Sequence, residues 1–140
     1  MELSVKKLVP DAKLPHYAHA DDAGMDIHAC EDVTIAPGAR ATIRTGIAVA
    51  IPDGHVGLYW DKSGLANNHG LTIIAGCIDA GYRGELMVTV LNTGSEAYAF
   101  AKGEKVTQLL IVPVMHPAII EAESLPASER GEGRFGSTGK

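Results

Sequence analysis

A chain of 140 residues is long enough for one domain with a sizeable core and too short for two ordinary domains. Hydrophobic residues supply 46% of the sequence and charged residues 21%, which is typical of a globular protein and excludes a disordered chain. The net charge of −5 and the scattered lysines and arginines argue against a protein that binds nucleic acid. A single site on such a chain can still be locally positive and bind a nucleotide-sized anion.

The sequence offers neither a membrane segment nor a disulfide framework. Apolar runs such as residues 109–112 are far too short to cross a membrane, and no signal-peptide pattern opens the chain. The two cysteines, Cys30 and Cys77, are too few for a disulfide scaffold and are expected as small core residues. We therefore expect a protein of the reducing cytoplasm that does not bind membranes.

Strand-forming and turn-forming residues alternate along the chain. Val, Ile and Thr supply 29 residues, and 16 glycines and 7 prolines separate them into segments of strand length. The turn signals stand at residues 22–24, 36–38, 52–54, 92–94 and 102–104. Many short strands at a spacing of roughly 8–12 residues predict an all-β sandwich or barrel. Because there is no internal repeat and no linker, residues 1–123 are expected to form a single domain.

Four segments carry the clearest patterns of secondary structure. β-Branched residues occupy every second position of residues 43–51, so we expect them on one face of one strand. Residues 63–68 are the best helical candidate, with one or two turns at most. Residues 86–90 again alternate, and residues 106–115, which are nearly all apolar, predict a strand that is buried on both faces.

Residues 124–140 combine cations, small residues and one aromatic, and we expect them to form a mobile arm. Arg130 can bind phosphate oxygens through its bidentate guanidinium, and Phe135 can stack on a base. Gly136 allows a close approach of the backbone to an anion, and Ser137 adds a hydroxyl donor. From composition alone the segment is either a disordered tail or a lid over a ligand, and the lone aromatic favours the lid.

Lys62 and Ser63 stand together, as in a phosphate-binding P-loop, but the preceding glycines are absent and the fold is predicted to be all-β. We therefore reject a P-loop. The Ser63-Gly64 turn either holds phosphate at the start of a short helix or only caps that helix.

Glycines bracket Asp79 and Tyr82 within residues 75–85, as in a β-hairpin that is open to a ligand. A carboxylate in such a place is either a general base that activates water or an Asx-turn residue.

Residues 21–26 are rich in carboxylates, which either bind Mg²⁺ or form a solvated loop. His16 and His19 lack a third ligand at a suitable spacing, so we expect no zinc site. Gln108 lies in an apolar segment and needs hydrogen-bond partners if it is buried, for either a structural or a ligand-binding role.

Taken in order, five segments resemble the five motifs of the trimeric dUTP diphosphatases (dUTPases). The segments are residues 23–27, 62–66, 76–84, 103–109 and 130–139. The third and fifth are the most specific, and the resemblance covers about residues 20–139. It implies a jelly-roll-like β-barrel, a homotrimer with its sites between subunits, and Mg²⁺-dependent hydrolysis of dUTP to dUMP and pyrophosphate. This activity limits the incorporation of uracil into DNA.

The resemblance also implies roles for individual residues. Asp79 would be the general base, and Tyr82 would pack under the deoxyribose and leave no room for a 2′-hydroxyl. Backbone groups near Gly76 and Met87 would bind the edge of uracil, and Asp26 would help to hold Mg²⁺ through water. The phosphates would be held by Ser63, Gly64, Gln108, Arg130, Gly136 and Ser137, and Phe135 would cover the base.

The chain departs from the family pattern at two positions of the predicted site. Lys62 is expected to bind substrate where the family usually has Arg, so it keeps the charge and loses the bidentate geometry. It follows an unusual Trp60-Asp61 pair. Arg134 stands where the family usually has Gly.

Two other functions are considered. A dCTP deaminase shares this fold and has a similar third motif, but its general base is a glutamate at the position of Thr89. A regulatory trimer could retain the nucleotide site and lack turnover, although Asp79, Tyr82 and Arg130 are all present.

Overall fold

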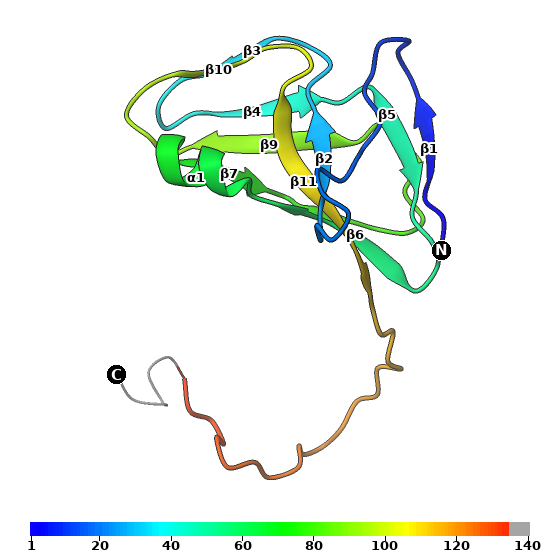
Figure 1. Cartoon of the computed structure of the whole chain (residues 1–140). Helices are drawn as coiled ribbons and strands as arrows, with labels where there is room; N and C mark the ends of the chain where they lie inside the picture. The colour runs from blue at the N-terminus through cyan, green and yellow to red at the C-terminus, as the bar shows by residue number, and fades with distance from the viewer. Residues whose placement is uncertain (135–140) are drawn as a thin grey trace.

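β-Branched residues between closely spaced turns fold the chain into an almost entirely β-structured domain. The computed structural model describes residues 1–134, which form eleven short strands and one helix (Figure 1). In chain order the elements are β1 Ser4–Lys7, β2 Met25–His28, β3 Val33–Ile35, β4 Arg40–Arg44, β5 Ile47–Ala50, β6 His55–Trp60, α1 Ser63–His69, β7 Leu71–Ile74, β8 Cys77–Ile78, β9 Met87–Asn92, β10 Tyr98–Phe100 and β11 Lys105–Pro113. The predicted all-β class is confirmed.

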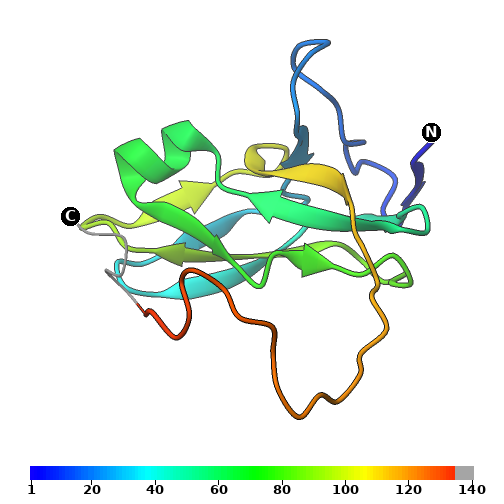
Figure 2. The same ribbon diagram turned by 90° about the horizontal axis from the view of Figure 1, so that it is seen from below.

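The strands pair in antiparallel fashion and lie in two layers (Figure 2). One sheet has the order β2-β11-β6-β8, and the second has the order β4-β9-β7. The pairs β1-β5 and β3-β10 complete the fold within the described residues. Ile27 and Leu109 from the first sheet join Ile43 and Val88 from the second in a single buried cluster. This arrangement is a jelly-roll-like sandwich with one core.

The alternation predicted for residues 86–90 is confirmed. Leu86, Val88 and Val90 are at most 1% exposed, whereas Met87 between them is 44% exposed. Because successive side chains of a strand point to opposite faces, this pattern directs three side chains into the core and Met87 outward.

The single strand predicted for residues 43–51 is wrong, because Gly46 interrupts it. Gly46 has φ +70°, and a Cβ at this position would lie 2.5 Å from Cγ2 of Val9. The chain therefore bends between β4 and β5, although the alternating residues from Ile43 to Ile51 all remain buried. Only glycine combines this backbone conformation with such close packing.

The strand at residues 106–115 is β11, and the prediction that both of its faces are buried is correct only for its first half. β11 pairs with β2 from Lys105 to Leu109, and with β6 from Gln108 to Pro113. Val106 and Leu109 are buried, whereas the residues from Leu110 to Val112 are half-buried. The burial decreases because β2 does not accompany the second half of the strand.

After β11 the chain leaves the sandwich as an extended segment (Figure 1). Its large apolar side chains are almost fully exposed: Met115 is 91%, Ile119 98%, Ile120 81% and Leu125 86% exposed. Residues 124–134 of the predicted arm are the distal part of this segment as the structure describes it. Within residues 1–134, no helix is long and apolar enough to span a membrane.

Both cysteines are free thiols. Cys30 is half-buried, whereas Cys77 is exposed, so the prediction that both are core residues is wrong for Cys77. Cys77 lies on the two-residue strand β8, whose inward position is taken by Ile78.

His28, at the end of β2, is 5% exposed, and its ring stacks on that of His16 with centroids 5.2 Å apart. Burial is the main cause that lowers the pKa of His28 to about 4. The neighbouring charges of Lys13, His16 and Lys105 act in the same direction, and Asp26 opposes them. His28 is therefore neutral in the folded protein at pH 7.

This histidine should make the fold less stable in mild acid. Between its ordinary pKa of 6.5 and its folded value of about 4, the unfolded state binds more protons, so stability rises with pH. We expect His28 to reduce the free energy of unfolding by about 2 kcal/mol between pH 7.5 and pH 5. Urea titrations at both pH values measure this difference, and His28→Gln should remove it. An equal difference in the variant would assign the effect to another group.

Candidate active site

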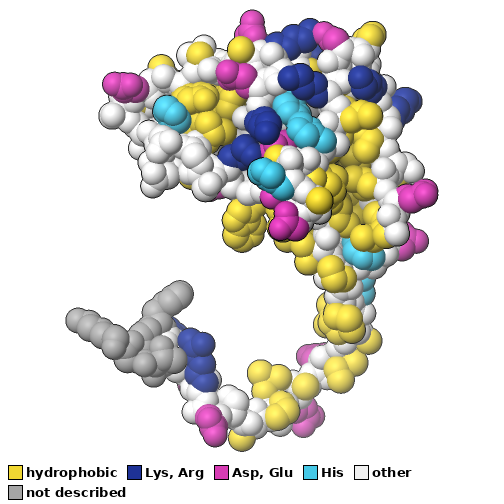
Figure 3. Space-filling view, viewed as in Figure 1, with side chains coloured by type: hydrophobic (Ala, Val, Ile, Leu, Met, Phe, Trp, Pro, Cys, Tyr) yellow, Lys and Arg dark blue, Asp and Glu magenta, His cyan; other side chains and the backbone are white. Residues whose placement is uncertain are grey.

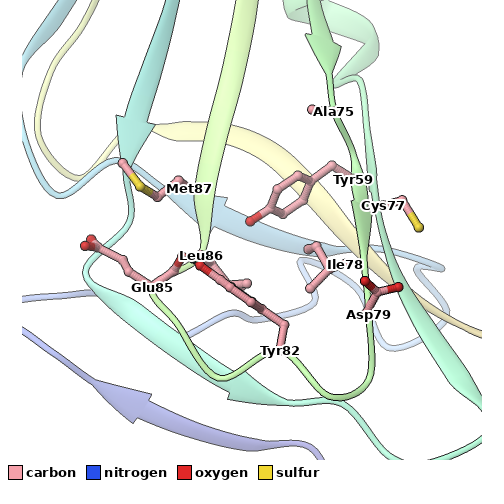
Figure 4. Close-up of a pocket in the computed structure, with 9 residues that line it drawn as sticks. All are labelled: Tyr59, Ala75, Cys77, Ile78, Asp79, Tyr82, Glu85, Leu86 and Met87. Atoms are coloured by element: carbon pink, nitrogen blue, oxygen red, sulfur yellow. Dashed lines mark hydrogen bonds between the residues drawn. The ribbon is translucent and has the colours of Figure 1, made fainter.

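A pocket of about 230 Å³ opens between β6, β8 and the start of β9 (Figure 4). The wall beside β8 requires a special backbone, because Ala75 has φ +58° and a Cβ on Gly76 would lie 3.2 Å from the Tyr59 carbonyl oxygen. The Tyr59 N–H donates to the Gly76 carbonyl over 2.8 Å, which fixes this wall against β6. Positive φ at a non-glycine residue is uncommon and concentrates at functional sites.

Asp79 lines this pocket and is exposed. Its backbone carbonyl accepts a hydrogen bond from the N–H of Tyr82 over 3.0 Å, which closes the turn. Among the described residues its carboxylate forms no hydrogen bond or ion pair, so the Asx-turn alternative finds no support. A carboxylate that is free and borders a pocket can accept a proton from water.

Tyr82 lies at the rim of the same pocket, with its side chain 46% exposed. Its hydroxyl donates to the Glu85 carbonyl over 3.0 Å, and its ring lies so close to Gly84 that a Cβ there would be 2.6 Å from Cζ. Glu85 in turn accepts hydrogen bonds from the Gly46 N–H and from Nε of Arg44. These contacts hold the aromatic ring at the entrance.

The structure therefore brings Asp79, Tyr82 and Met87 together around one pocket. Gly76 stands between the lining residues Ala75 and Cys77 but does not itself line the pocket. The predicted β-hairpin is wrong in its pairing, because β8 pairs with β6 whereas β9 pairs with β4 and β7. The turn from Asp79 to Tyr82 instead connects the two sheets beside the pocket. The pocket combines apolar walls, one free carboxylate and one exposed aromatic ring, and this combination suits a flat organic group with an attached polar chain.

A second group of predicted residues surrounds Asp26. Asp26 is 4% exposed, and its carboxylate pairs with the ammonium groups of Lys62 and Lys105, the latter at 2.6 Å. Burial alone would raise the pKa of this carboxyl, but the two lysines outweigh it and hold the pKa below its usual value. Asp26 is therefore ionised and neutralised on two sides.

The loop before α1 is fixed by hydrogen bonds to two strands, β7 and β11. The Asp61 carboxylate accepts hydrogen bonds from the Thr72 hydroxyl over 2.9 Å and from the Ile73 N–H over 2.7 Å. Gln108 donates from Nε2 to the Asp61 carbonyl over 3.0 Å, and the Thr107 hydroxyl donates to the Trp60 carbonyl over 2.8 Å. The unusual Trp60-Asp61 pair thus positions Lys62, Ser63 and Gly64 at the start of α1.

A larger pocket of about 720 Å³ lies beside this loop. Its lining includes three lysines, three histidines, one glutamate and Gly64: Lys13, Lys62, Lys105, His16, His28, His69 and Glu104. Lysines and histidines gather on this face in Figure 3. Such a surface suits phosphate groups. No described residue lines both this basic pocket and the pocket that contains Asp79.

Residues 124–134 of the arm line neither pocket within their own chain. Arg130 is exposed, and its Nε donates to the Gly133 carbonyl over 3.1 Å in a local turn. The predicted site residues Phe135, Gly136 and Ser137 lie outside the described residues.

Residues 1–134 contain no group of three or more His, Cys, Asp or Glu side chains that could hold a metal ion. Within the acidic segment at residues 21–26, only Asp26 pairs with residues that line the basic pocket, namely Lys62 and Lys105. This donor set does not suit an ion that is held mainly by the protein.

The sequence motifs predict no role for three residues at these sites. Lys105 neutralises Asp26, Asp61 anchors the loop before α1, and Tyr59 forms part of the Asp79 pocket. The sequence does point to Asp61, because the Trp60-Asp61 pair before Lys62 is unusual for the family. Lys105 and Tyr59 carry no such signal, since a lysine at a strand start and a tyrosine inside a strand are both common.

The chain matches the family model for dUTPase over residues 10–139. It is 47% identical to the deoxyuridine 5'-triphosphate nucleotidohydrolase of Thermobifida fusca, over 99% of this chain and 79% of that protein. It is 45% identical to the protein of that name from Nautilia profundicola, over the full length of both.

Solved structures agree with these matches. The fold superimposes with a TM-score of 0.93 on a mutant dUTPase of Staphylococcus bacteriophage 80alpha with dUpNHpp, at 35% identity and over 99% of each chain. A mutant dUTPase from phage phi11 of S. aureus, described for its coordination of a structural Mg(II) ion, gives a TM-score of 0.83 at 33% identity, over 89% of this chain and 98% of that one.

Proposed function

The chain belongs to the dUTPase family, and from this premise we propose that it hydrolyses dUTP to dUMP and pyrophosphate. The observation that carries the proposal is the pocket beside the turn between β8 and β9, where a free Asp79 carboxylate and the exposed Tyr82 ring border a cavity of about 230 Å³. A cavity of this size can accept a pyrimidine base. The two free cysteines agree with a cytoplasmic setting.

Asp79 is proposed as the general base. Its carboxylate takes a proton from a water molecule, whose oxygen attacks the α-phosphorus. The new oxygen–phosphorus bond forms as the bond from the α-phosphorus to the bridging oxygen breaks, and pyrophosphate leaves with the electron pair of that bond. Because Asp79 has no cationic partner among residues 1–134, its carboxylate is available for this proton.

The basic pocket is proposed to hold the phosphates. Lys62, Ser63 and Gly64 border or adjoin it at the start of α1, and the hydrogen bond from Gln108 to Asp61 fixes that loop. Arg130, with Phe135, Gly136 and Ser137, is proposed to close over the nucleotide. Donors that surround the phosphates stabilise the charge that develops as pyrophosphate leaves.

Magnesium fits this site as an ion that is bound mainly by the nucleotide. Asp26 already pairs with Lys62 and Lys105, so it can offer a contact through water but cannot supply a complete set of ligands. Mg²⁺ commonly keeps several waters and binds substrate phosphates together with one or two carboxylates. When bound, the ion would neutralise phosphate charge and favour departure of pyrophosphate.

A homotrimer is the proposed assembly. The pocket that contains Asp79, here called the nucleoside pocket, shares no described residue with the basic pocket. The large apolar side chains between residues 115 and 125 are exposed on a segment that leaves the body. Both features are explained if neighbouring subunits complete each site and cover the segment.

We therefore expect the protein to have a mass close to three times 14.7 kDa in solution. Multi-angle light scattering measures this mass, and dilution to the monomer should abolish turnover. A fully active monomer would contradict a site that is shared between subunits.

Tyr82 is expected to exclude ribonucleotides. If its ring packs against C2′ of the sugar, UTP is a very poor substrate, and Tyr82→Ala should reduce the ratio of kcat/KM for dUTP over UTP by about tenfold or more. Tyr17→Phe is a control on an exposed tyrosine outside the pocket. An unchanged ratio in Tyr82→Ala would place the sugar filter at another residue.

The structure gives no support to the deaminase alternative. Thr89 lies at the position of the deaminase glutamate, and its hydroxyl lies 3.1 Å from that of Thr42. Neither group is a carboxylate. Pyrophosphate release from dUTP tests the proposed hydrolysis, whereas a regulatory trimer would bind the nucleotide without releasing pyrophosphate.

A further inference from the structure

Tyr59 forms the inner wall of the nucleoside pocket. It lies on β6, and its ring extends across the cavity towards Leu86 and Met87 (Figure 4). Its side chain is only 7% exposed, in contrast to Tyr82 at the rim, which is 46% exposed. Tyr59 therefore occupies the deep end of the pocket and Tyr82 the entrance.

The Tyr59 hydroxyl has no hydrogen-bond partner among residues 1–134. Buried polar groups nearly always have a partner, and a buried tyrosine hydroxyl usually finds one. The hydroxyl points into a cavity, so the group that satisfies it can come from a molecule bound there.

The surrounding backbone keeps the ring in this position. The Tyr59 N–H donates to the Gly76 carbonyl over 2.8 Å, and Tyr59 pairs with Leu109 in the register of β6 and β11. Burial also raises the pKa of Tyr59 above its ordinary value, so the hydroxyl keeps its proton at neutral pH. It can therefore donate a hydrogen bond but cannot serve as a base.

We propose that Tyr59 is a further substrate-binding residue, whose hydroxyl donates a hydrogen bond to a carbonyl oxygen of the pyrimidine base. This inference rests on the proposed function, because it takes the ligand to be a deoxyuridine nucleotide. The base is the expected partner, since the phosphates belong with the basic pocket and Tyr82 holds the sugar at the entrance. A carbonyl oxygen is the natural acceptor for a neutral phenol.

The test is Tyr59→Phe, which removes only the hydroxyl and keeps the ring. We expect the Kd for dUMP and the KM for dUTP to rise by about tenfold, with kcat changed by less than about twofold. The melting temperature of the ligand-free variant should stay equal or rise, because an unsatisfied hydroxyl has been removed from a buried site. Calorimetric titration with dUMP and steady-state kinetics supply these values, with Tyr17→Phe as the matched control.

A purely structural role for Tyr59 predicts a different result. The melting temperature would then fall while the Kd for dUMP stayed at the parent value, and this outcome would overturn the inference. If the parent protein hydrolyses dUTP and Tyr59→Phe has an unchanged Kd, only the inference fails. If the parent protein neither binds dUMP nor hydrolyses dUTP, the proposed function fails and the inference falls with it.

Discussion

Asp79→Asn is expected to reduce kcat for dUTP by about two to four orders of magnitude, the range that a positioned general base contributes. Asparagine keeps the shape of the side chain but cannot take a proton from water. In the structure the Asp79 carboxylate has no hydrogen bond or ion pair among residues 1–134, so the exchange breaks no contact of the fold. Binding of dUTP should therefore be largely retained, as a titration with a non-hydrolysable analogue would show.

The control for this variant is Asp53→Asn, on an exposed turn that lines neither the nucleoside pocket nor the basic pocket. It should leave both kcat and KM at the parent values. Hydrolysis by Asp79→Asn at close to the parent rate would exclude Asp79 as the base and would direct the search to another acceptor near the pocket.

Truncation after Glu129 is expected to reduce turnover by about two orders of magnitude or more, the scale of losing donors that stabilise developing charge. The truncation removes Arg130 and the predicted Phe135, Gly136 and Ser137. Arg130 contacts only Gly133 within the described residues, so the body should keep its fold. The apolar residues at 115–125 remain, and the assembly and melting temperature should therefore hardly change.

Arg134→Gly serves as the comparison for the truncation, because it restores the usual family residue within the same arm. We expect it to be neutral or slightly activating in steady-state kinetics. A truncated protein with undiminished turnover would show that the arm is a tail without a role in the reaction.

The parts of the fold that depend on local patterns could be predicted from the sequence. The alternation of residues 86–90 and the short helix before Gly70 depend on neighbours in the chain, and both are present. The bend at Gly46 could not be predicted, because it depends on the close approach of Val9, which lies in the connection between β1 and β2. The partial burial of β11 depends in the same way on where β2 ends.

The same distinction applies to the candidate site, where residues close in sequence could be placed together and residues joined by strand pairing could not. Asp79 and Tyr82 are close in sequence, and one turn is enough to place them at the same pocket. The neutralisation of Asp26 required the register between β2 and β11, which brings Lys105 beside it. Tyr59 lies on β6 and becomes part of the pocket because β6 pairs with β8. No local sequence pattern specifies that pairing.

The proposed hydrolysis is tested most directly by a comparison of dUTP, dCTP, dTTP and UTP as substrates, with pyrophosphate and ammonia measured in the same reactions. We expect Mg²⁺-dependent release of pyrophosphate from dUTP at a rate far above that of the other three nucleotides, without ammonia. Release of ammonia from dCTP, or binding of dUTP without release of pyrophosphate, would contradict it.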